Sequence, residues 1–296
     1  MELRHLRYFA AVAEELHFGR AAERLGIRQP PLSQQIKALE DDLGVALFDR
    51  SSRRVRLTAA GQTLYPAARD ILASVQAARR TTRRAGRGES GELSLGFVGS
   101  ATNVLLPEAL RAFRRDYPDV TLHLRELTTM QQAHALREGA LDVGLLRPPL
   151  PADAAAGLTV DPVGAERLMA ALPVDHPLAA ERVVDAGRLA AEPFVLFPRE
   201  LGPGLHDRIL GYCAEAGFAP AIAQEAVQMQ TIVALVASGL GVSVVPSSVA
   251  RTRRQGAVFR PLRPSARVVH LAVARRRDEE NPVARNFVTA VRRAAS

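Results

Sequence analysis

Polar and basic side chains gather on one face of a helix that the sequence predicts to begin at Pro30 or Pro31. Proline is tolerated there because a first-turn amide has no intrahelical partner. At 100° per residue the apolar residues of this helix lie within about 60° of one another and the polar residues lie opposite. Glutamine can bond adenine bidentately and serine can bond either kind of base, so the polar face could read base edges. The apolar face carries Leu32, Ile36, Leu39 and Leu43, and the polar face Pro30, Ser33, Gln34 and Lys37.

A second set of residues follows the predicted strands of the C-terminal two thirds of the chain. Ligands of open α/β sheets bind at the carboxyl ends of the strands. Ser100 and Thr128 follow strands and open helices, where unpaired amides and the helix dipole favour an anion. We therefore expect a small anionic ligand there, unless both hydroxyls only cap their helices. The residues just past the strand ends are Ser100, Thr128, Arg147, Phe197 and Gln228.

Two roles are open to Arg147 at this predicted site. It could pair with a carboxylate of the ligand, or it could form an ion pair between two lobes of the domain, with Glu166 as the partner. Phe197 and Ile232 could supply an apolar wall, because small-molecule pockets are mostly apolar with a few placed polar groups.

Short helices position the first set of residues. Apolar residues recur at helical spacing over residues 6–16 and 18–25, and Gly26 ends the second helix. A short turn between the second and third helices is the helix-turn-helix arrangement, whose recognition helix offers its N-terminal residues to base edges. Two short strands are predicted around a basic turn at residues 51–54, as a wing placed to contact phosphates or a minor groove.

Charge is distributed unevenly along the chain. The formal charge is +8, and residues 1–90 hold 16 Lys and Arg against 10 Asp and Glu, leaving 23 against 21 in the remainder. A basic first third favours contact with a polyanion through phosphates. The alternative is a high arginine content that reflects genome composition, since Lys37 is the only lysine.

Cysteine usage and hydropathy fit a cytoplasmic protein. Cys213 is the only cysteine, which excludes an intramolecular disulfide and a thiolate metal cluster and fits a reducing compartment. No continuous apolar segment of a signal peptide is present near the N-terminus. The uncharged stretch over residues 226–250 is interrupted by polar residues and Pro246, so we expect a buried helix, turn and strand and no membrane span.

The N-terminal segment resembles the LysR family of transcriptional regulators. The match rests on LRYFAAVAEELHFGRAAERLGIRQPPLSQQIKALEDDLGVALFDR and VRLTAAGQ. The resemblance implies double-stranded promoter DNA as a partner and admits contact with RNA polymerase. It also implies that Gln29, Pro30, Ser33, Gln34 and Lys37 sit in the major groove and that Arg50, Arg53 and Arg54 lie along the wing.

Two positions depart from the family pattern. The family commonly has Ser at the position of Arg28 and Thr or Ser at that of Gly19. Glycine is an acceptable helix cap, but Arg28 has no side-chain oxygen for capping, and we expect it to contact a phosphate instead.

A long helix is predicted after Thr58, a good N-cap. Its apolar residues are spaced 4, 3, 4 and 3 apart, as in a coiled-coil seam, although two heptads also fit a helix packed on its own domain. Pro66 lies inside this helix and should kink it. The family resemblance favours antiparallel pairing of linker helices in a homodimer that assembles into a homotetramer. The seam consists of Leu64, Ala68, Ile71, Val75 and Ala78.

From Glu92 onward, strands alternate with helices, which predicts an α/β fold with a largely parallel sheet. The resemblance implies two Rossmann-like lobes similar to periplasmic binding proteins, crossed twice by the chain. Five segments look most like the LysR subgroup that controls aromatic-acid and catechol breakdown, namely GFVGSA, LLPE, LRELTT, PFVLFP and GLGVSVVP. The expected effector is therefore a small carboxylic acid, and one derived from an aromatic ring if the chain belongs to that subgroup. The predicted parts are the winged helix-turn-helix domain 1–58, linker 59–88 with a hinge at 87–91, lobe I 89–162 with 267–296, and lobe II 163–266.

Enzymatic functions find little support. Ser100 lacks the G-x-S-x-G spacing of a hydrolase, the histidines lack metal-ligand spacing, and no Gly-Lys-Ser or Gly-Lys-Thr marks a phosphate loop. Cys213, on a predicted helix without a resolving partner, is expected to be structural. The alternative to a regulator is a small-molecule binding protein or enzyme with a basic helical head and no sequence-specific DNA function. We expect no cofactor and no metal.

Overall fold

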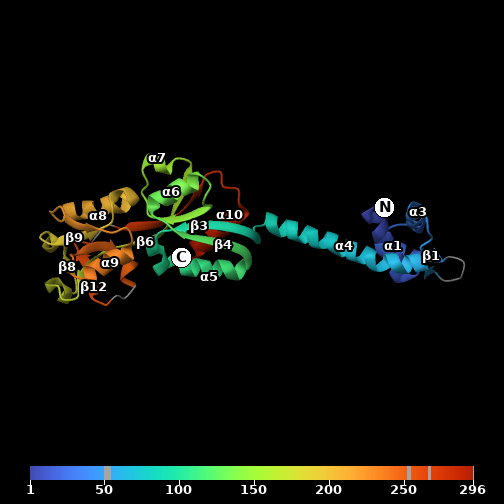
Figure 1. Cartoon of the computed structure of the whole chain (residues 1–296), viewed down its shortest axis with the longest axis horizontal. Helices are drawn as coiled ribbons and strands as arrows, with labels where there is room; N and C mark the ends of the chain where they lie inside the picture. Colours follow the sequence, from blue (N-terminus) through green and yellow to red (C-terminus); the bar gives the residue numbers. More distant parts are fainter. Residues whose placement is uncertain (50–54, 252–254, 266–267, 296) are drawn as a thin grey trace. The chain divides into compact units, whose positions relative to one another are not determined.

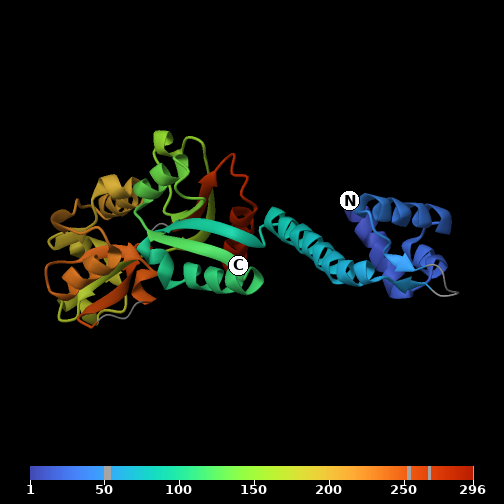
Figure 2. The same ribbon diagram turned by 45° about the vertical axis from the view of Figure 1, so that its right-hand side comes forward.

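The computed structural model describes residues 1–49, 55–251, 255–265 and 268–295. These residues form two compact units, Met1–Arg84 and Ala85–Ser296. The first unit is mainly helical, and the second combines sheets and helices (Figures 1 and 2). Each unit has its own hydrophobic core.

Helices build the first unit around an aromatic core. The rings of Phe9 and Phe18 both contact the ring of Phe48, at centroid distances of 5.4 and 5.8 Å. The strands β1 (Phe48–Asp49) and β2 (Arg56–Leu57) pair antiparallel, as predicted for the wing. The helices before them are α1 (Leu3–Glu15), α2 (Phe18–Leu25) and α3 (Gln29–Leu43).

The buried face of α3 is shorter than predicted. Leu32, Ile36 and Leu39 are fully buried, whereas Leu43 keeps 38% of its surface exposed. The prediction of Leu43 as a core residue is wrong because the helix ends there. Gly44 follows with a φ of +70°, in the left-handed conformation that commonly closes a helix.

The start of α2 is capped by a histidine. His17 Nδ1 accepts hydrogen bonds from the amides of Gly19 and Arg20, at 3.1 and 3.2 Å. The expectation that Gly19 serves as the cap is wrong, since His17 immediately precedes the helix and has an extended backbone. At the start of α3, Arg28 makes no side-chain capping bond, as expected from its chemistry.

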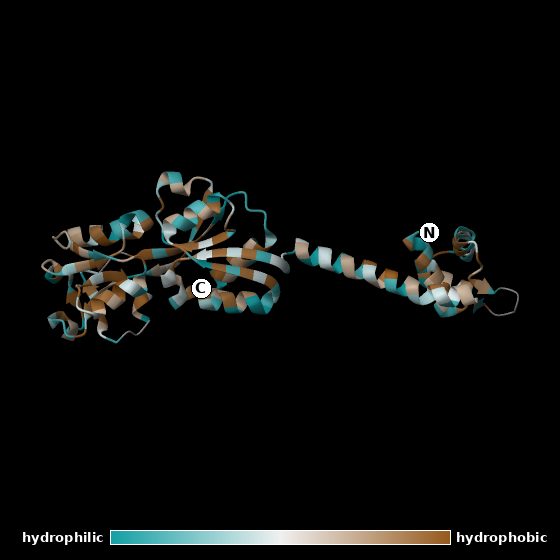
Figure 3. Ribbon diagram, viewed as in Figure 1, coloured by the Kyte–Doolittle hydropathy of each residue, from teal (hydrophilic) through white to brown (hydrophobic). Residues whose placement is uncertain are grey.

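Helix α4 (Ala59–Gly86) contains the predicted linker. Thr58 Oγ1 accepts a hydrogen bond from the amide of Gly61 at 3.0 Å, which confirms the predicted cap. Ala68 is buried and Leu64 packs in the core of the first unit, so this part of the seam serves its own domain. Ile71 is 39% exposed. Hydrophobic and hydrophilic segments alternate along α4 (Figure 3).

Lobe I of the second unit is a helix-covered sheet. Its described strands are ordered β4-β3-β5-β13-β6. Helices α5 and α10 share one hydrophobic core on one face, and α6 belongs to a second core on the other (Figure 1). The strands are β3 (Ser90–Phe97), β4 (Asp119–Glu126), β5 (Val143–Leu146), β6 (Leu158–Glu166) and β13 (Val269–Arg276). The helices are α5 (Leu105–Asp116), α6 (Thr129–Arg137), α7 (Ala152–Ala155) and α10 (Pro282–Ala295).

Lobe II is a second sheet with helices around it. The described strands β11, β7, β12 and β8 form one sheet in that order, and β10 pairs with β9. Its elements are β7 (Leu168–Pro173), β8 (Val184–Asp185), β9 (Pro193–Leu196), α8 (Pro203–Glu215), β10 (Ala221–Glu225), α9 (Met229–Ala237), β11 (Ser243–Pro246) and β12 (Ala257–Arg263). The short 3-10 helices of the domain are η1 (Gly99–Asn103), η2 (Pro177–Ala180), η3 (Ala186–Leu189), η4 (Arg199–Leu201) and η5 (Val249–Arg251).

The expectation of a largely parallel sheet holds only in part for lobe II, where β10 pairs parallel with β9 and β12 pairs parallel with β8. Strand β7 pairs antiparallel with both β11 and β12. In lobe I, β3 pairs parallel with β4 and β5, whereas β13 is antiparallel to both β5 and β6. The reversal of β13 follows from the crossings, because β6 leads the chain toward lobe II and β13 brings it back.

Domain boundaries differ slightly from the predicted ones. Glu166 still pairs with Val269 in the lobe I sheet, four residues beyond the predicted boundary at 162. Ser90 and Gly91, expected in the hinge, already belong to β3. Cys213 lies in the core of lobe II, and burial raises its pKa to about 11, which supports the structural role.

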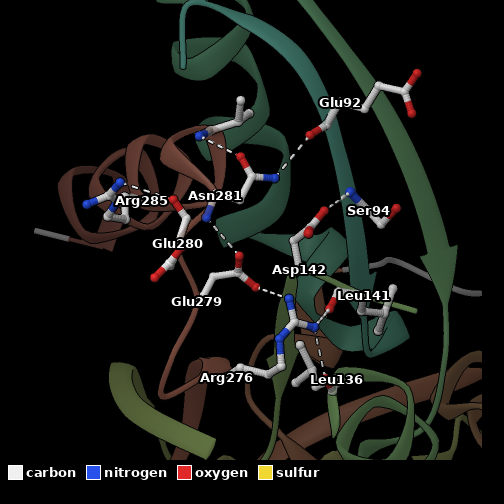
Figure 4. A network of polar contacts seen from close by, with 11 residues as sticks. Glu92, Ser94, Leu136, Leu141, Asp142, Arg276, Glu279, Glu280, Asn281 and Arg285 are labelled. Carbon is white, nitrogen blue, oxygen red and sulfur yellow. Dashed lines mark hydrogen bonds and ion pairs between the residues drawn. The ribbon is translucent and has the colours of Figure 1, made fainter. Parts of the chain in front are cut away.

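A polar network attaches the C-terminal segment to lobe I (Figure 4). Arg276 donates to the carbonyls of Leu136 and Leu141, at 3.1 and 3.0 Å, and pairs with Glu279. Asn281 donates from Nδ2 to the Glu92 carbonyl at 3.4 Å. These contacts support the return of the last strand and helix to the first lobe.

Candidate functional site

Helix α3 presents the predicted base-reading residues at the surface. Most of these side chains are exposed, and Ser33 is half-buried beside them. They lie opposite the buried face of α3, so the helical geometry that the sequence predicts holds. The exposed set is Arg28, Gln29, Pro30, Gln34 and Lys37.

The start of the wing is fixed to α3. Glu40 Oε1 accepts hydrogen bonds from the amides of Leu47 and Phe48, at 2.8 and 3.1 Å. Strand β2 follows with Arg56 exposed. The predicted wing residues Arg50, Arg53 and Arg54 lie outside the described residues.

Most of the predicted ligand residues line a cavity between the two lobes. It contains about 470 Å³ of space not filled by atoms, part of it open to solvent. The first turns of η1, α6 and α9 border it, together with Leu201, Gly202 and Leu205 around the start of α8. Its lining includes Ser100, Thr128, Thr129, Arg147, Phe197, Leu201, Gly202, Leu205 and Gln228.

Arg147 is the central polar residue of this cavity. Only 4% of its surface is exposed. Its Nε and Nη2 donate to Ser100 Oγ at 3.1 and 3.0 Å, and Nη2 reaches Glu166 Oε1 at 2.8 Å. Nη2 also lies 3.4 Å from Ser248 Oγ in lobe II. Nη1 is buried and has no hydrogen-bond partner in the described part of the chain.

Glu166 completes an ion pair at the junction of the lobes. Burial by itself raises the pKa of its carboxyl, but the charge of Arg147 and hydrogen bonds from Ser248 and Arg147 outweigh burial. The net pKa is therefore lowered below the ordinary value, and the carboxyl stays ionised. The Ser248 amide donates to Glu166 Oε2 at 2.8 Å. The predicted pair of Arg147 with Glu166 is thus present, but both residues belong to lobe I, and Ser248 supplies the contact from lobe II.

The two hydroxyl residues play different parts. Thr128 caps α6, because its Oγ1 accepts from the amide of Gln131 at 3.4 Å while the Gln131 side chain accepts from the Thr128 amide. Ser100 makes no capping bond and instead receives both bonds from Arg147. The capping alternative therefore holds for Thr128 and fails for Ser100.

Phe197 lines the cavity as expected, whereas Ile232 does not. Ile232 is fully buried in the hydrophobic core of lobe II and is not part of the cavity lining in the described chain. The assignment of Ile232 to the cavity wall is therefore wrong, because its side chain faces the core. Gln228 lies at the cavity, immediately before α9.

Sequence reasoning missed Ser248 at this site and the hydrogen bond that Thr129 makes to Arg147. Ser248 follows strand β11 by two positions, so the rule that ligands bind past strand ends could have found it. Thr129 Oγ1 accepts from the Arg147 amide at 3.3 Å, a contact between separate elements that no local pattern shows.

A winged helix-turn-helix unit joined to a two-lobed α/β domain with a cavity between the lobes defines a class: DNA-binding regulators with a small-molecule binding domain. Comparisons with known proteins agree. Residues 3–62 match the model described as bacterial regulatory helix-turn-helix protein, lysR family, and residues 86–296 match the LysR substrate binding domain. The chain belongs to the LysR family of DNA-binding transcriptional regulators, which are not enzymes.

Related proteins match over nearly the whole chain. YnfL of Escherichia coli K12, an uncharacterised HTH-type transcriptional regulator, is 47% identical over 97% of this chain and 96% of its own. The regulator AlsR of Bacillus subtilis is 40% identical over 97% of this chain and 94% of its own. The crystal structure of full-length CbnR complexed with target DNA covers 100% of both chains, at 34% identity and a TM-score of 0.80.

Within the described residues, no helix combines the length and the apolar character that crossing a bilayer requires.

Proposed function

We propose that this regulator responds to a small carboxylic acid bound in the cavity between its lobes. The observation that carries the proposal is Arg147 Nη1, a buried donor without a partner in the described chain. A buried unsatisfied donor costs about 1–3 kcal/mol, and more for a charged group. A ligand carboxylate at this atom would remove that cost and would form a charge-assisted hydrogen bond.

The helix starts around the cavity support an anionic ligand. The first turns of α6 and α9 border the cavity and present backbone amides that lack intrahelical partners. The positive ends of the helix dipoles add to the attraction for negative charge. The charge of Arg147 is partly balanced by Glu166, so hydrogen-bond geometry has to contribute to recognition alongside net charge.

A ligand in this cavity would touch both lobes. Ser100 and Thr128 belong to lobe I, whereas Phe197 and Gln228 belong to lobe II. Binding would therefore stabilise one relative orientation of the lobes. This differential contact can turn binding into a signal, because a ligand with equal affinity for two arrangements shifts neither. An aromatic-derived acid, as in the aromatic-acid subgroup, remains our expectation for the wild type.

Ser100→Ala is expected to weaken binding of the preferred acid about tenfold, because it removes a hydroxyl at the cavity and releases two bonds of Arg147. Isothermal calorimetry with benzoate-like and dicarboxylic acids measures the change. Ser238→Ala is the matched control, since the Ser238 hydroxyl bonds Ala234 on α9 and does not line the cavity. Wild type that binds no acid, or equal affinity of Ser100→Ala and wild type, would contradict the proposal.

We also propose that a second copy of the chain covers the exposed half of the seam on α4. Ile71 lies on this half and keeps 39% of its surface exposed. Sedimentation at micromolar concentration should show a dimer or tetramer for wild type and a smaller species for Ile71→Glu. Gln76→Glu, an exposed position off the seam, should sediment like wild type. A monomeric wild type rules out this assembly.

A further inference from the structure

The backbones of the two lobes approach closely where Gly204 meets Pro149. Gly204 is the second residue of α8 in lobe II. A Cβ at this position would lie 2.2 Å from the carbonyl oxygen of Pro149 and 2.7 Å from its nitrogen. Pro149 belongs to lobe I. Both obstructing atoms are backbone atoms, so they cannot rotate away as a side chain would.

Helix geometry does not explain this glycine. The φ angle of Gly204 is not positive, unlike that of the glycines whose left-handed backbone favours this residue type. Alanine would be preferred inside a helix by about 1 kcal/mol. Glycine is the only residue type without the Cβ that would overlap the backbone of Pro149.

This contact is continuous with the lining of the cavity. Arg147, Gly202 and Leu205 line the cavity. Pro149 lies two residues after Arg147, and Gly204 lies between Gly202 and Leu205. The lobes also meet close to this cavity at Ser248 of lobe II, which contacts Arg147 and Glu166 of lobe I. The spacing of the lobes at Gly204 therefore bears on the width of the cavity.

We propose that Gly204 is a specificity-determining position, which sets how closely the lobes approach and so limits the size of the acid that fits. This inference rests on the proposed function of the same cavity. An alanine methyl group at 2.2 Å from the Pro149 oxygen must displace it by at least about 1.2 Å to reach an ordinary contact distance. Moving the lobes apart by that amount loosens contacts with a small acid and admits a larger one.

Calorimetry with acetate, butanoate, benzoate and 2-naphthoate on the full chain tests the proposal. For Gly204→Ala we expect the smallest acid that wild type binds to weaken about tenfold, while the next larger acid of the series keeps or gains affinity. Gly211→Ala is the matched control, because it changes a glycine of the same helix with nothing within 4 Å of the added methyl. Its size profile should equal that of wild type.

Three results would overturn the inference. One is an unchanged size profile in Gly204→Ala, and another is equal weakening for all acids. The third is loss of cooperative thermal unfolding in Gly204→Ala, because lobes that can separate must tolerate the methyl group. Failure of the proposed function differs from these, since wild type would then bind none of the acids.

Discussion

Arg147→Met is expected to lower the free energy of unfolding of the chain by about 3–5 kcal/mol, the usual cost of removing one partner of a buried ion pair. The substitution leaves the Glu166 carboxylate, whose side chain is 16% exposed, without its cation. It also removes both hydrogen bonds to Ser100. Binding of the preferred acid should be lost together with Nη1, the donor that carries the proposed function.

A double variant separates stability from binding. In Arg147→Met/Glu166→Gln neither member of the pair is charged, and the glutamine oxygen can still accept from the Ser248 amide, as Glu166 Oε2 does at 2.8 Å. We expect most of the lost stability to return while acid binding stays absent. Chemical denaturation and calorimetry on the full chain measure the two quantities. Acid binding by the double variant would show that Arg147 does not hold the ligand.

Acid pH gives a second measure of the same pair. The pKa of Glu166 is lowered in the folded chain from an ordinary value of 4.5. A lowered folded pKa contributes stability that is present above the ordinary pKa and is lost as the pH falls through the folded pKa. The stability difference between wild type and the double variant should therefore be constant near neutral pH and change only below about pH 4.5. A stability difference that changes between pH 6 and 8 would show that a group other than Glu166 is responsible.

Local patterns predicted the first unit well. The helices before the wing, the cap at Thr58 and the exposed face of α3 all depend on residues close in sequence. The errors there are at helix ends. Leu43 fits the apolar period but lies in the last turn, and the cap at His17 depends on a ring nitrogen that period analysis ignores.

The second unit was harder to predict because its site joins distant segments. Strand β6 contains Asp161, Pro162 and Gly164 and shows no clean alternation, so the sequence did not indicate it. The apolar period correctly indicates that Ile232 lies on a buried face of its helix. The period cannot show whether that face contacts the core or a cavity. The approach of Gly204 to Pro149 joins residues 55 positions apart and leaves no local signal.

The second large effect concerns DNA recognition. Gln29→Ala is expected to weaken binding to the preferred operator by about 1–3 kcal/mol and to leave binding to random DNA nearly unchanged, because glutamine can bond a base bidentately. Gln29 is the first residue of α3 and is exposed. Alanine is a better helix former than glutamine, so the fold of the head should not suffer. Ser33→Ala, at a half-buried position on the same face, should relax sequence preference in the same way.

Arg53→Ala provides the contrast, since the family resemblance implies that Arg53 lies along the wing and contacts phosphates. It should weaken binding to all sequences alike and reduce the salt slope by about 1. Gln76→Ala is the matched control for Gln29→Ala, because Gln76 is an exposed glutamine on α4, away from α3. Binding titrations on operator and random DNA at several salt concentrations measure both terms. Equal losses on the two DNAs for Gln29→Ala would remove Gln29 from base readout and leave it a phosphate contact.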